Sequence, residues 1–405
     1  MTYRPAHRLA DIEPFHVVEL LTRARQLEAE GRDIIHMEVG EPDFPTPEPI
    51  AEAAIAAIRD HKTLYTQALG LPELRAAISA FYGQRYGVTV PASRIAITNG
   101  ASGALNLAFA ALANPGDEWL LADPGYPCNR HILRTYEGLP RSIPVGPDSN
   151  FQPTPEQVSA EWNERTAGLL VASPANPTGT LLTLDEIAAL ANECRAKDGH
   201  FLVDEIYHGL TYAPSPKGTC SAAQEVPLGD EVDAPTACAA GDDIWVINSF
   251  SKYFQMTGWR LGWMVIPEPY VRDVEKLAQN LTLCPSTPAQ YAALAAFAPA
   301  TIEILEARRG EFRRRRDFLA PALEAIGFRV TARPEGAFYL YCDCSALAAD
   351  SFVLARDLLE KTGVAATPGL DFGSNEPEKH IRFAYTTEIP RLAEAVSRLS
   401  AYFGR

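Results

Sequence analysis

A lysine between two serines is the residue of this chain whose setting most suggests chemistry. Lys252 lies four residues after the apolar run IWVIN (244–248), with Ser249 and Ser251 beside it, and Arg260 follows eight residues later. A lone lysine is usually a surface charge. Near the end of a buried strand, beside hydroxyls and a guanidinium, its amine suits attack on a carbonyl group while an adjacent phosphate is held.

A carboxylate ends a second apolar run. Asp204 follows FLV (201–203), and Tyr207 comes about one turn later. Taken alone, such an aspartate is most often a capping or turn residue. The functional alternative is a carboxylate that pairs with a protonated ring nitrogen, because a buried carboxylate requires a positive or donating partner.

Three weaker motifs follow other apolar runs. SPANPTG (173–179) is ordinary turn chemistry when it stands alone. The small residues of TNGASGALNLAF (98–109) would let backbone N–H groups at a helix N-terminus approach a phosphate, although tight helix–strand packing explains them equally well. In DPGYP (123–127), Tyr126 is either a core or turn aromatic or a side chain that stacks on a planar ring.

The elements that must position these motifs alternate along the chain. Short apolar runs are separated by helical or mixed segments; the runs are RIAIT, EWLLA, GLLVA, HFLVD and IWVIN. Near-continuous apolar strands that alternate with helices predict an α/β fold with a mostly parallel sheet covered on both faces. Ligands bind beyond the carboxyl ends of the strands in such sheets, which is where the motifs lie.

Helix signals are clear at several places. We expect a helix over residues 8–30, and another that begins with Thr46 as N-cap and Pro47 at the first helical position. Thr183, with Glu186 three residues on, predicts a capping box.

The last third of the chain differs in pattern. A long helical stretch is expected around 287–325, and its run Arg313 to Arg316 is interpreted as a solvated face. GAFYLYCD (336–343), a helix at 351–361 and HIRFAY (380–385) indicate a smaller α+β unit.

Composition narrows the function classes. The 405 residues carry a formal charge of −15, which disfavours nucleic acid and anionic membranes as partners. Seven cysteines without a CxxC pair favour a reduced, cytoplasmic setting, and no secretory signal or membrane-spanning apolar stretch is visible. Cys342 and Cys344 are expected to pack rather than bind metal, and no metal site is predicted. Residues 214–243 are expected to form a long surface loop.

Together these motifs resemble the class I/II (fold type I) pyridoxal-phosphate-dependent aminotransferases. The resemblance covers nearly the whole chain, from VGEPDFPTP to HIRFAY, and the SxSK…R and DEIY motifs are its most specific parts. It implies the fold type I architecture: a large cofactor-binding domain (46–286) with a mostly parallel central sheet, and a small α+β domain formed by 1–45 plus 287–405.

The resemblance implies a role for each motif. Lys252 would hold pyridoxal 5'-phosphate covalently, Asp204 would pair with its pyridine nitrogen, and Tyr126 would stack on its ring. Tyr207 and Asn176 would hydrogen-bond the phenolic oxygen of the ring. The residues that would hold the phosphate are Ala101, Ser102, Ser249, Ser251 and Arg260.

The resemblance also implies a homodimer and a substrate site. Tyr65 would reach the phosphate of the neighbouring subunit, so that the active sites are shared. Arg382 would bind the substrate α-carboxylate as a two-pronged pair, with Asn176 nearby, and the backbone at Gly40 would close over it. Aspartate-type relatives carry a lysine where this chain has Ser102, which disfavours an aspartate-specific enzyme.

We therefore expect an aminotransferase that moves the amino group of an L-amino acid to a 2-oxo acid in a ping-pong cycle. The apolar residues Phe15, Val18 and Val39 favour neutral or hydrophobic donors. The alternatives are a C–S β-lyase or cyclising lyase on the same site, an aspartate/alanine-type transaminase and, more distantly, a non-catalytic cofactor-binding regulator. A nicotinamide-dependent dehydrogenase is disfavoured because no G-x-G-x-x-G follows a strand.

Overall fold

The five apolar runs become strands of one seven-stranded sheet. The computed structural model describes residues 4–212 and 233–405. The strand order is β2-β8-β7-β6-β5-β3-β4, and β8 runs antiparallel to its neighbours β2 and β7 while the other pairs are parallel. The strands are β2 (Ile95–Thr98), β3 (Glu118–Asp123), β4 (Leu139–Pro144), β5 (Thr166–Ala172), β6 (His200–Asp204), β7 (Trp245–Ser249) and β8 (Gly262–Val265). The expected mostly parallel sheet is confirmed.

Both faces of this sheet are covered, which explains why the five predicted strands are largely apolar, whereas the edge strand β4 is mixed and partly exposed. Along β6, Phe201 and Val203 pack into one buried cluster and Leu202 packs into the other, on the opposite face. The helices of this part are α2 (Glu48–Arg59), α3 (Pro72–Tyr86), α4 (Gly100–Leu112), α5 (Pro127–Thr135), α6 (Pro155–Glu161), α7 (Leu184–Ala196), α8 (Val271–Leu281) and α9 (Thr287–Leu294).

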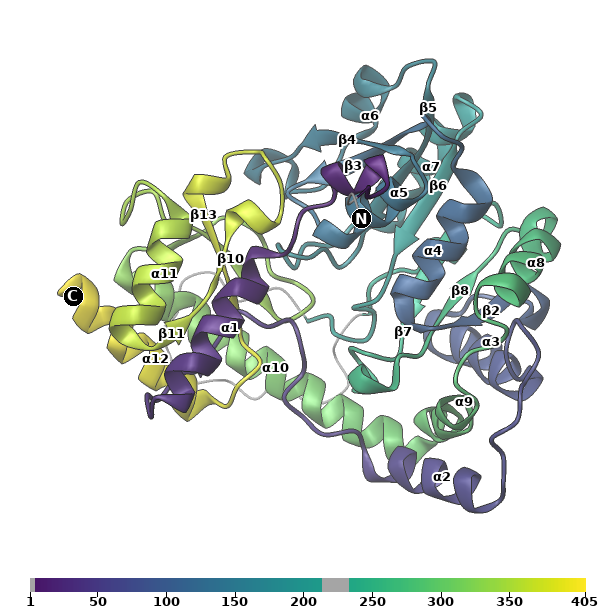
Figure 1. Ribbon diagram of the computed structural model, residues 1–405, viewed down its shortest axis with the longest axis horizontal. Helices are drawn as coiled ribbons and strands as arrows, with labels where there is room; N and C mark the ends of the chain where they lie inside the picture. The colour runs from purple at the N-terminus through teal and green to yellow at the C-terminus, as the bar shows by residue number, and fades with distance from the viewer. Residues whose placement is uncertain (1–3, 213–232) are drawn as a thin grey trace.

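A second part of the molecule is built on a four-stranded antiparallel sheet of order β12-β13-β10-β9. A short parallel pair, β1 with β11, lies beside it, and the long helix α10 extends from the region of α9 to β10 (Figure 1). The elements of this second part are α1 (His16–Ala29), β1 (Ile35–His36), α10 (Pro299–Ile326), β9 (Arg329–Val330), β10 (Tyr339–Asp343), α11 (Ser351–Thr362), β11 (Val364–Ala365), β12 (Thr367–Pro368), β13 (His380–Ala384) and α12 (Ile389–Phe403).

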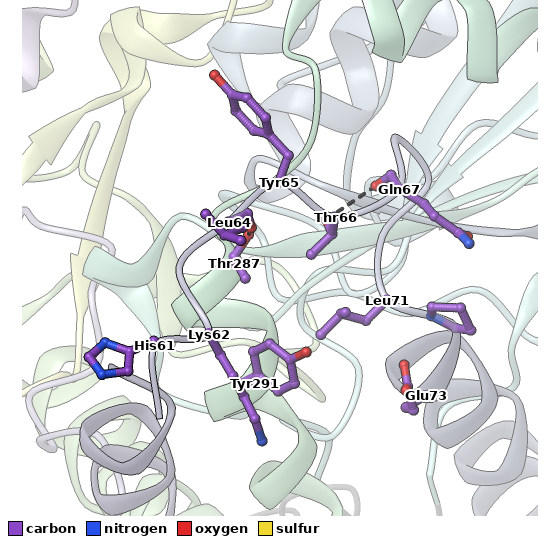
Figure 2. Close-up of a pocket in the computed structure, with 11 residues that line it drawn as sticks. His61, Lys62, Leu64, Tyr65, Thr66, Gln67, Leu71, Glu73, Thr287 and Tyr291 are labelled. Carbon is purple, nitrogen blue, oxygen red and sulfur yellow. Dashed lines mark hydrogen bonds between the residues drawn. The ribbon is translucent and has the colours of Figure 1, made fainter. Parts of the chain in front are cut away.

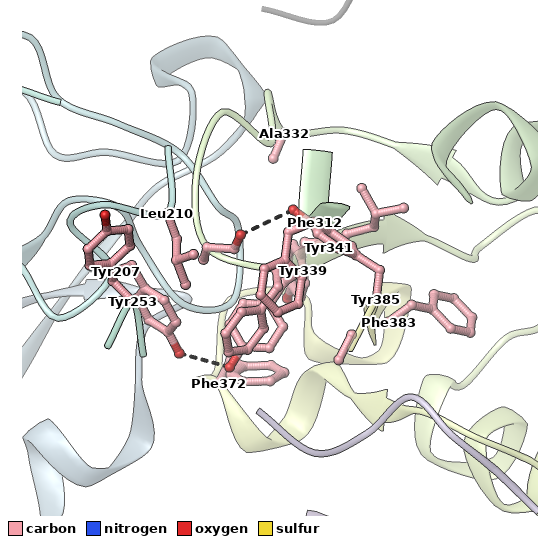
Figure 3. Packing of buried hydrophobic residues seen from close by; sticks show 14 of the residues in the cluster. Tyr207, Leu210, Tyr253, Phe312, Ala332, Tyr339, Tyr341, Phe372, Phe383 and Tyr385 are labelled. Atoms are coloured by element: carbon pink, nitrogen blue, oxygen red, sulfur yellow. Dashed lines mark hydrogen bonds between the residues drawn. The ribbon is translucent and has the colours of Figure 1, made fainter. Parts of the chain in front are cut away.

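Aromatic side chains fill the space between the two parts. Tyr207, which follows β6, contacts Tyr339 of β10 (Figure 3). The Phe338 ring contacts the rings of Tyr207 and Phe312. Tyr212 donates a hydrogen bond to the carbonyl of Ala337 at 2.6 Å, and this joins the chain after β6 to the start of β10. The segment that follows β6 is therefore held against the start of β10.

Two expected helix starts are wrong. The helix expected over 8–30 is a 3-10 turn (His7–Asp11) followed by α1, because Pro14 lacks an N–H and restricts the residue before it. Thr46 is not the cap of α2, which begins at Glu48 after Pro47. The Thr46 hydroxyl instead donates to the carbonyl of Gln255 at 2.9 Å.

The capping box at α7 is confirmed. The backbone N–H of Glu186 donates to the Thr183 hydroxyl at 3.3 Å, and the Glu186 carboxylate accepts from the Thr183 N–H at 2.7 Å. Cys342 and Cys344 are both fully buried, as expected for packing residues. Of the loop expected at 214–243, residues 214–232 lie outside the described residues, and the remainder contains the 3-10 turn Ala237–Ala239.

The stretch expected as one helix over 287–325 is two helices, because Pro299 begins α10 and ends the continuity with α9. The interpretation of Arg313 to Arg316 as a solvated face is also wrong for two of the four residues. Arg315 and Arg316 are 3% and 2% exposed. Arg315 pairs with Asp43 at 2.7 Å, because the helical period turns this face of α10 toward the core and not toward solvent.

Among residues 4–212 and 233–405, no helix combines the length and the apolarity needed to cross a bilayer.

Candidate active site

Residues from four segments meet at one edge of the seven-stranded sheet. Asp204 is the last residue of β6, and Lys252 stands three residues after β7. Asn176 lies in the turn after β5, and Tyr126 lies between β3 and α5. The carboxyl ends of parallel strands share an edge, so local sequence at each strand end is sufficient to bring these side chains to the same place.

Lys252 is enclosed by the backbone and by aromatic rings. Its Nζ donates to the carbonyl of Gly40 at 2.6 Å and lies 5.5 Å from the centre of the Tyr207 ring. Burial, and then the nearby Arg382 guanidinium, lower the pKa of Lys252 to about 8. The amine therefore loses its proton far more readily than a surface lysine, which makes it a better nucleophile and base.

Asp204 is a buried carboxylate that forms no ion pair with any of the residues the structure describes. Its Oδ1 accepts a hydrogen bond from the backbone N–H of Ile206 at 3.1 Å, and its side chain is 3% exposed. Burial raises the pKa of Asp204 to about 7, and the Ile206 N–H and Lys252 oppose that rise only in part. A positively charged or donating group beside this carboxylate would restore its ionised form.

Tyr207 and Tyr339 form a buried hydroxyl pair. Their oxygens are 2.8 Å apart, and burial raises the pKa of both phenols. A Cβ on Gly40 would stand 2.1 Å from the Tyr339 hydroxyl oxygen, so only glycine fits there. Sequence reasoning missed Tyr339, although the alternating run GAFYLYCD that carries it was recognised as a strand.

The N-terminus of α4 forms a cradle with Arg260. A Cβ on Gly100 would lie 2.8 Å from a terminal nitrogen of Arg260, and a Cβ on Gly262 would lie 2.8 Å from the carbonyl carbon of Gly100 and 3.0 Å from the N of Ala101. The two glycines thus let Arg260 and β8 approach the first turn of α4. In the described part of the chain no carboxylate pairs with Arg260. A guanidinium beside free helix N–H groups is a binding site for an anion such as phosphate.

Hydroxyl groups lie on the β7 side of this cradle. The Ser249 hydroxyl accepts from the backbone N–H of Ser251 at 3.0 Å and donates to the carbonyl of Leu261 at 3.4 Å. Both serines are buried. Ser102 lies in the first turn of α4, where its carbonyl accepts from the Asn106 side chain at 2.7 Å.

Arg382 of β13 presents a guanidinium to the same space. It is 5% exposed, and one terminal nitrogen donates to the side-chain oxygen of Asn176 at 2.8 Å. The other donates to the carbonyl of Glu38 at 2.6 Å and to the Thr367 hydroxyl at 3.2 Å. None of these acceptors is a charged side chain, so the positive charge stays available for an anion.

Two rings enclose this guanidinium. The centre of the Tyr339 ring is 4.2 Å from its central carbon, and that of Phe372 is 4.9 Å away. The stacked rings exclude water and restrict the guanidinium to one plane. Glu38, Thr367 and Phe372 were not identified from sequence, because no local motif marks them.

Tyr126 and Tyr65 differ in their surroundings. Tyr126 caps the start of α5 without a side-chain bond to the helix, and its hydroxyl accepts from the Cys128 thiol at 3.1 Å. Tyr65 does not join the other site residues within this chain. It is 82% exposed and borders a surface cavity of about 610 Å³, where its ring points away from Lys62 and Tyr291 (Figure 2).

Of the apolar residues expected near the donor, Phe15 and Val18 lie at the start of α1, and Val39 lies after β1, between Glu38 and Gly40. Phe15 precedes the helix and Val18 is 51% exposed. The N–H groups of His16 and Val17 donate to the Asp371 carboxylate, both at 2.8 Å, so the helix start is tied to the loop that carries Phe372.

Comparison with known proteins shows that aminotransferases are similar in sequence to this chain over nearly its whole length. The valine–pyruvate aminotransferase of Mycobacterium tuberculosis is 38% identical to this chain over 99% of each protein. The aspartate aminotransferase of Geobacillus stearothermophilus is 32% identical over 98% of each.

Solved structures give the same result. A crystal structure of an aminotransferase from Mycobacterium tuberculosis superimposes with a TM-score of 0.91, at 38% identity and full coverage of both chains. The aspartate aminotransferase from Thermus thermophilus with maleate superimposes with a TM-score of 0.88, at 32% identity, over 99% of this chain and 100% of that one. Because residues 32–399 also match the family described as aminotransferase class I and II, this chain belongs to that family and is an aminotransferase.

Proposed function

We propose that this aminotransferase uses pyridoxal 5'-phosphate to move the amino group of a neutral or hydrophobic L-amino acid to a 2-oxo acid in a ping-pong cycle. The observation that carries the proposal is the combination of a low-pKa lysine, a buried carboxylate that forms no ion pair with a described residue, and an arginine at a helix N-terminus. These three groups match the aldehyde, the ring nitrogen and the phosphate of that cofactor.

The donor set fits the cofactor residue by residue. Lys252 would hold it covalently and Asp204 would pair with its protonated ring nitrogen, which removes the cost of the buried carboxylate. Tyr207 and Asn176 would donate to its phenolic oxygen, and Tyr126 would lie against its ring. The groups around its phosphate would be Ala101, Ser102, Ser249, Ser251 and Arg260. When bound, pyridoxal phosphate supplies an electron sink for charge at the substrate Cα.

Lys252 would move the proton. When the Lys252 amine is not bound to the cofactor, it would lie beside the substrate Cα. An amine whose pKa is about 8 is partly unprotonated near neutral pH, so it can accept the Cα proton and later return it. Gly40, whose carbonyl accepts from this amine at 2.6 Å, keeps the lysine close to the substrate position.

Arg382 would bind the substrate α-carboxylate through two parallel hydrogen bonds. Asn176 and the carbonyl of Glu38 hold its terminal nitrogens, so the guanidinium is oriented before substrate arrives. The same contact would serve the amino-acid donor and the 2-oxo-acid acceptor, since both carry this carboxylate.

The type of side chain on the amino-acid donor is inferred from residues at the start of α4 and of α1. Ser102 offers no cation for a second carboxylate, and Phe15 and Val18 are apolar. The relative named valine–pyruvate aminotransferase supports the same reading. We infer a neutral or hydrophobic donor, with valine as the first candidate and pyruvate as the acceptor to try first.

A homodimer is part of the proposal. Leu64 and Tyr65 are 79% and 82% exposed, an unusual state for adjacent large apolar side chains. A second copy of the chain would cover them, and Tyr65 would reach the phosphate of the partner's site. Analytical ultracentrifugation of Tyr65→Phe and wild type, with the cofactor affinity of each, tests this.

Absorption spectroscopy tests the cofactor and the donor together. The purified protein is expected to be yellow with pyridoxal phosphate, and the band should bleach with L-valine but not with L-aspartate. Lys252→Ala should show neither the band of the covalently bound cofactor nor turnover, whereas Lys361→Ala, which changes an exposed lysine of α11, should behave as wild type.

Other outcomes separate the alternatives. Near-normal transamination by Lys252→Ala would refute the assignment of this lysine. Release of ammonia from cystathionine without a 2-oxo acid would support the C–S β-lyase. Stronger bleaching with L-aspartate would identify an aspartate-type enzyme despite Ser102.

A further inference from the structure

The segment of residues 33–40 supplies main-chain acceptors to two cations of the site, Lys252 and Arg382. The carbonyl of Glu38 accepts from Arg382 and the carbonyl of Gly40 accepts from Lys252, both at 2.6 Å. Thr367 also donates to the Glu38 carbonyl at 2.9 Å. The position of this segment therefore sets where the two cations point.

The Glu38 side chain is an unusual occupant of this segment. It is fully buried, and its Oε1 lies 2.7 Å from Nδ1 of His36. Its Oε2 has no hydrogen-bond partner in the part of the chain that the structure describes. A buried carboxylate is costly unless it is paired, and an apolar residue would fill the same space at lower cost. A functional role therefore explains the Glu38 carboxylate better than packing does.

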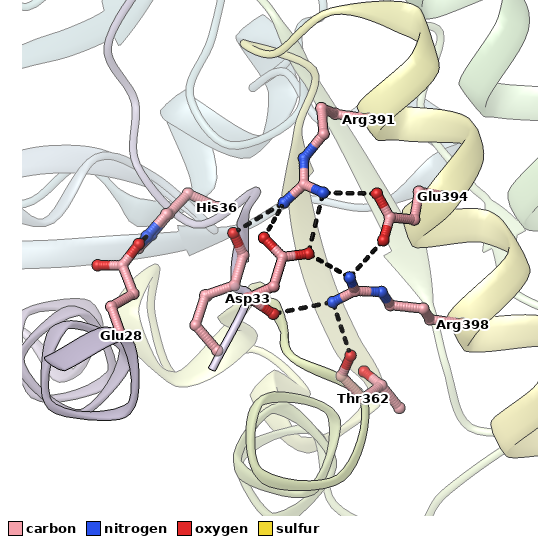
Figure 4. Close-up of polar contacts among 8 residues, drawn as sticks. Glu28, Asp33, His36, Thr362, Arg391, Glu394 and Arg398 are labelled. Atoms are coloured by element: carbon pink, nitrogen blue, oxygen red, sulfur yellow. Dashed lines mark hydrogen bonds and ion pairs between the residues drawn. The ribbon is translucent and has the colours of Figure 1, made fainter. Parts of the chain in front are cut away.

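His36 joins this carboxylate to α1. Its Nε2 lies 3.1 Å from Oε1 of Glu28, and Figure 4 shows the two side chains facing each other. Its side chain is 33% exposed, so the imidazolium keeps part of its hydration while it balances the buried charge of Glu38. The charged groups in contact with His36, among residues 4–212 and 233–405, are Glu28 on α1 and Glu38 on its own segment.

The other end of the segment has separate anchors. Arg391 and Arg398 of α12 both bind the Asp33 carboxylate, and Arg391 also donates to the carbonyl of Ile34 at 3.2 Å (Figure 4). These contacts fix residues 33 and 34 without help from Glu38. The pair of His36 and Glu38 acts on the following residues, which lead into the site.

We propose that Glu38, held by His36, is a positioning residue for the substrate carboxylate: it fixes the main-chain carbonyl that orients Arg382. A carboxylate needs two parallel N–H donors in one plane, so a small rotation of the guanidinium loses part of the contact. Donor and acceptor share this contact, so both should be affected equally. This inference rests on the role proposed above for Arg382.

A pH dependence follows from the same pair. The hydrogen bond to Glu38, followed by smaller contributions from its charge and from Glu28, raises the pKa of His36 to about 9 against an ordinary value of 6.5. Because the pKa is raised in the folded protein, the pair is intact at neutral pH and is lost as the pH rises through about 9. Substrate KM should rise above that pH in wild type, and this rise should be absent from Glu38→Gln.

The test compares KM and kcat for donor and acceptor in the cofactor-loaded enzyme. Glu38→Gln and His36→Gln should each raise both KM values about tenfold or more, as small misplacements in a binding site do, with kcat nearly unchanged. Glu28→Gln, which removes only the exposed partner of His36, should leave both KM values within about twofold of wild type. The His36 ring should titrate near pH 9 by NMR in wild type and closer to 6.5 in Glu38→Gln.

Arg382→Gln tests the proposed role of Arg382 separately from the inference about Glu38. If it leaves both KM values unchanged, the proposed role of Arg382 fails. If it raises them while Glu38→Gln and His36→Gln do not, the inference about Glu38 fails alone. Should Glu38→Gln not fold, His36→Gln and the NMR titration of wild type still decide: a His36 that titrates near 6.5 in wild type would overturn the proposal.

Discussion

Replacing Asp204 by asparagine should stabilise the cofactor-free protein while it impairs the enzyme. Burial raises the pKa of this carboxyl from 3.8 to about 7. Each pKa unit corresponds to about 1.4 kcal/mol, so keeping the charge buried above pH 7 costs about 4 kcal/mol of unfolding free energy. Asparagine fills almost the same space and carries no charge.

The sign and the pH window follow from the raised pKa. Below pH 3.8 the carboxyl is protonated in the folded and the unfolded protein, so it has no effect. Between pH 3.8 and about 7 only the unfolded chain is ionised, and wild type loses stability as the pH rises. The advantage of Asp204→Asn should therefore be about 1–2 kcal/mol at pH 5 and about 4 kcal/mol at pH 8.

Urea unfolding of cofactor-stripped protein at pH 5 and pH 8 measures this difference. Asp185→Asn, which changes an exposed aspartate in the first turn of α7, is the matched control and should show no such trend. With pyridoxal phosphate bound, the order should reverse, because the ring nitrogen pairs with Asp204 in wild type only. An advantage that is absent, or equal at both pH values, would refute the view that Asp204 is an uncompensated buried acid.

Three further substitutions test other parts of the molecule. Gly262→Ala should weaken cofactor binding about tenfold in an absorbance titration, because its Cβ would lie 2.8 Å from the carbonyl carbon of Gly100, whereas Gly258→Ala meets nothing within 4 Å and should bind normally. Thr183→Ala should lower the unfolding free energy by about 1 kcal/mol in urea, through loss of the capping box of α7, and an unchanged midpoint would contradict that role. Ser102→Lys should raise kcat/KM for L-aspartate relative to L-valine, and no change in that ratio would show that position 102 does not face the donor side chain.

Local sequence was sufficient for features whose cause is local. The strands around Asp204 and Lys252 could be predicted because their residues are buried on both faces, and their shared edge follows from parallel order. The capping box at Thr183 involves atoms three residues apart. Signals of this kind depend on nearby atoms, so they hold however the rest of the chain packs.

The features that were predicted wrongly depend instead on contacts between residues far apart in the chain. Thr46 has the residue type of a helix cap, yet its hydroxyl binds the carbonyl of Gln255, more than two hundred residues away. Arg315 and Arg316 look like surface charges, yet α10 turns them toward the core, where Asp43 is one of their partners. Helical and strand periodicity do not say which distant segment will cover a face.

The sequence by itself thus determined five strands of the sheet, the family resemblance and the strand-end motifs, because each depends on short runs of residues. Only the tertiary structure decided how the guanidinium of Arg382 is oriented, since its acceptors come from Asn176, Glu38 and Thr367. The same holds for the contact between Tyr207 and Tyr339, and for the burial of Glu38 beside His36. Such partners are chosen by the packing of segments far apart in the chain, and no spacing along the sequence encodes them.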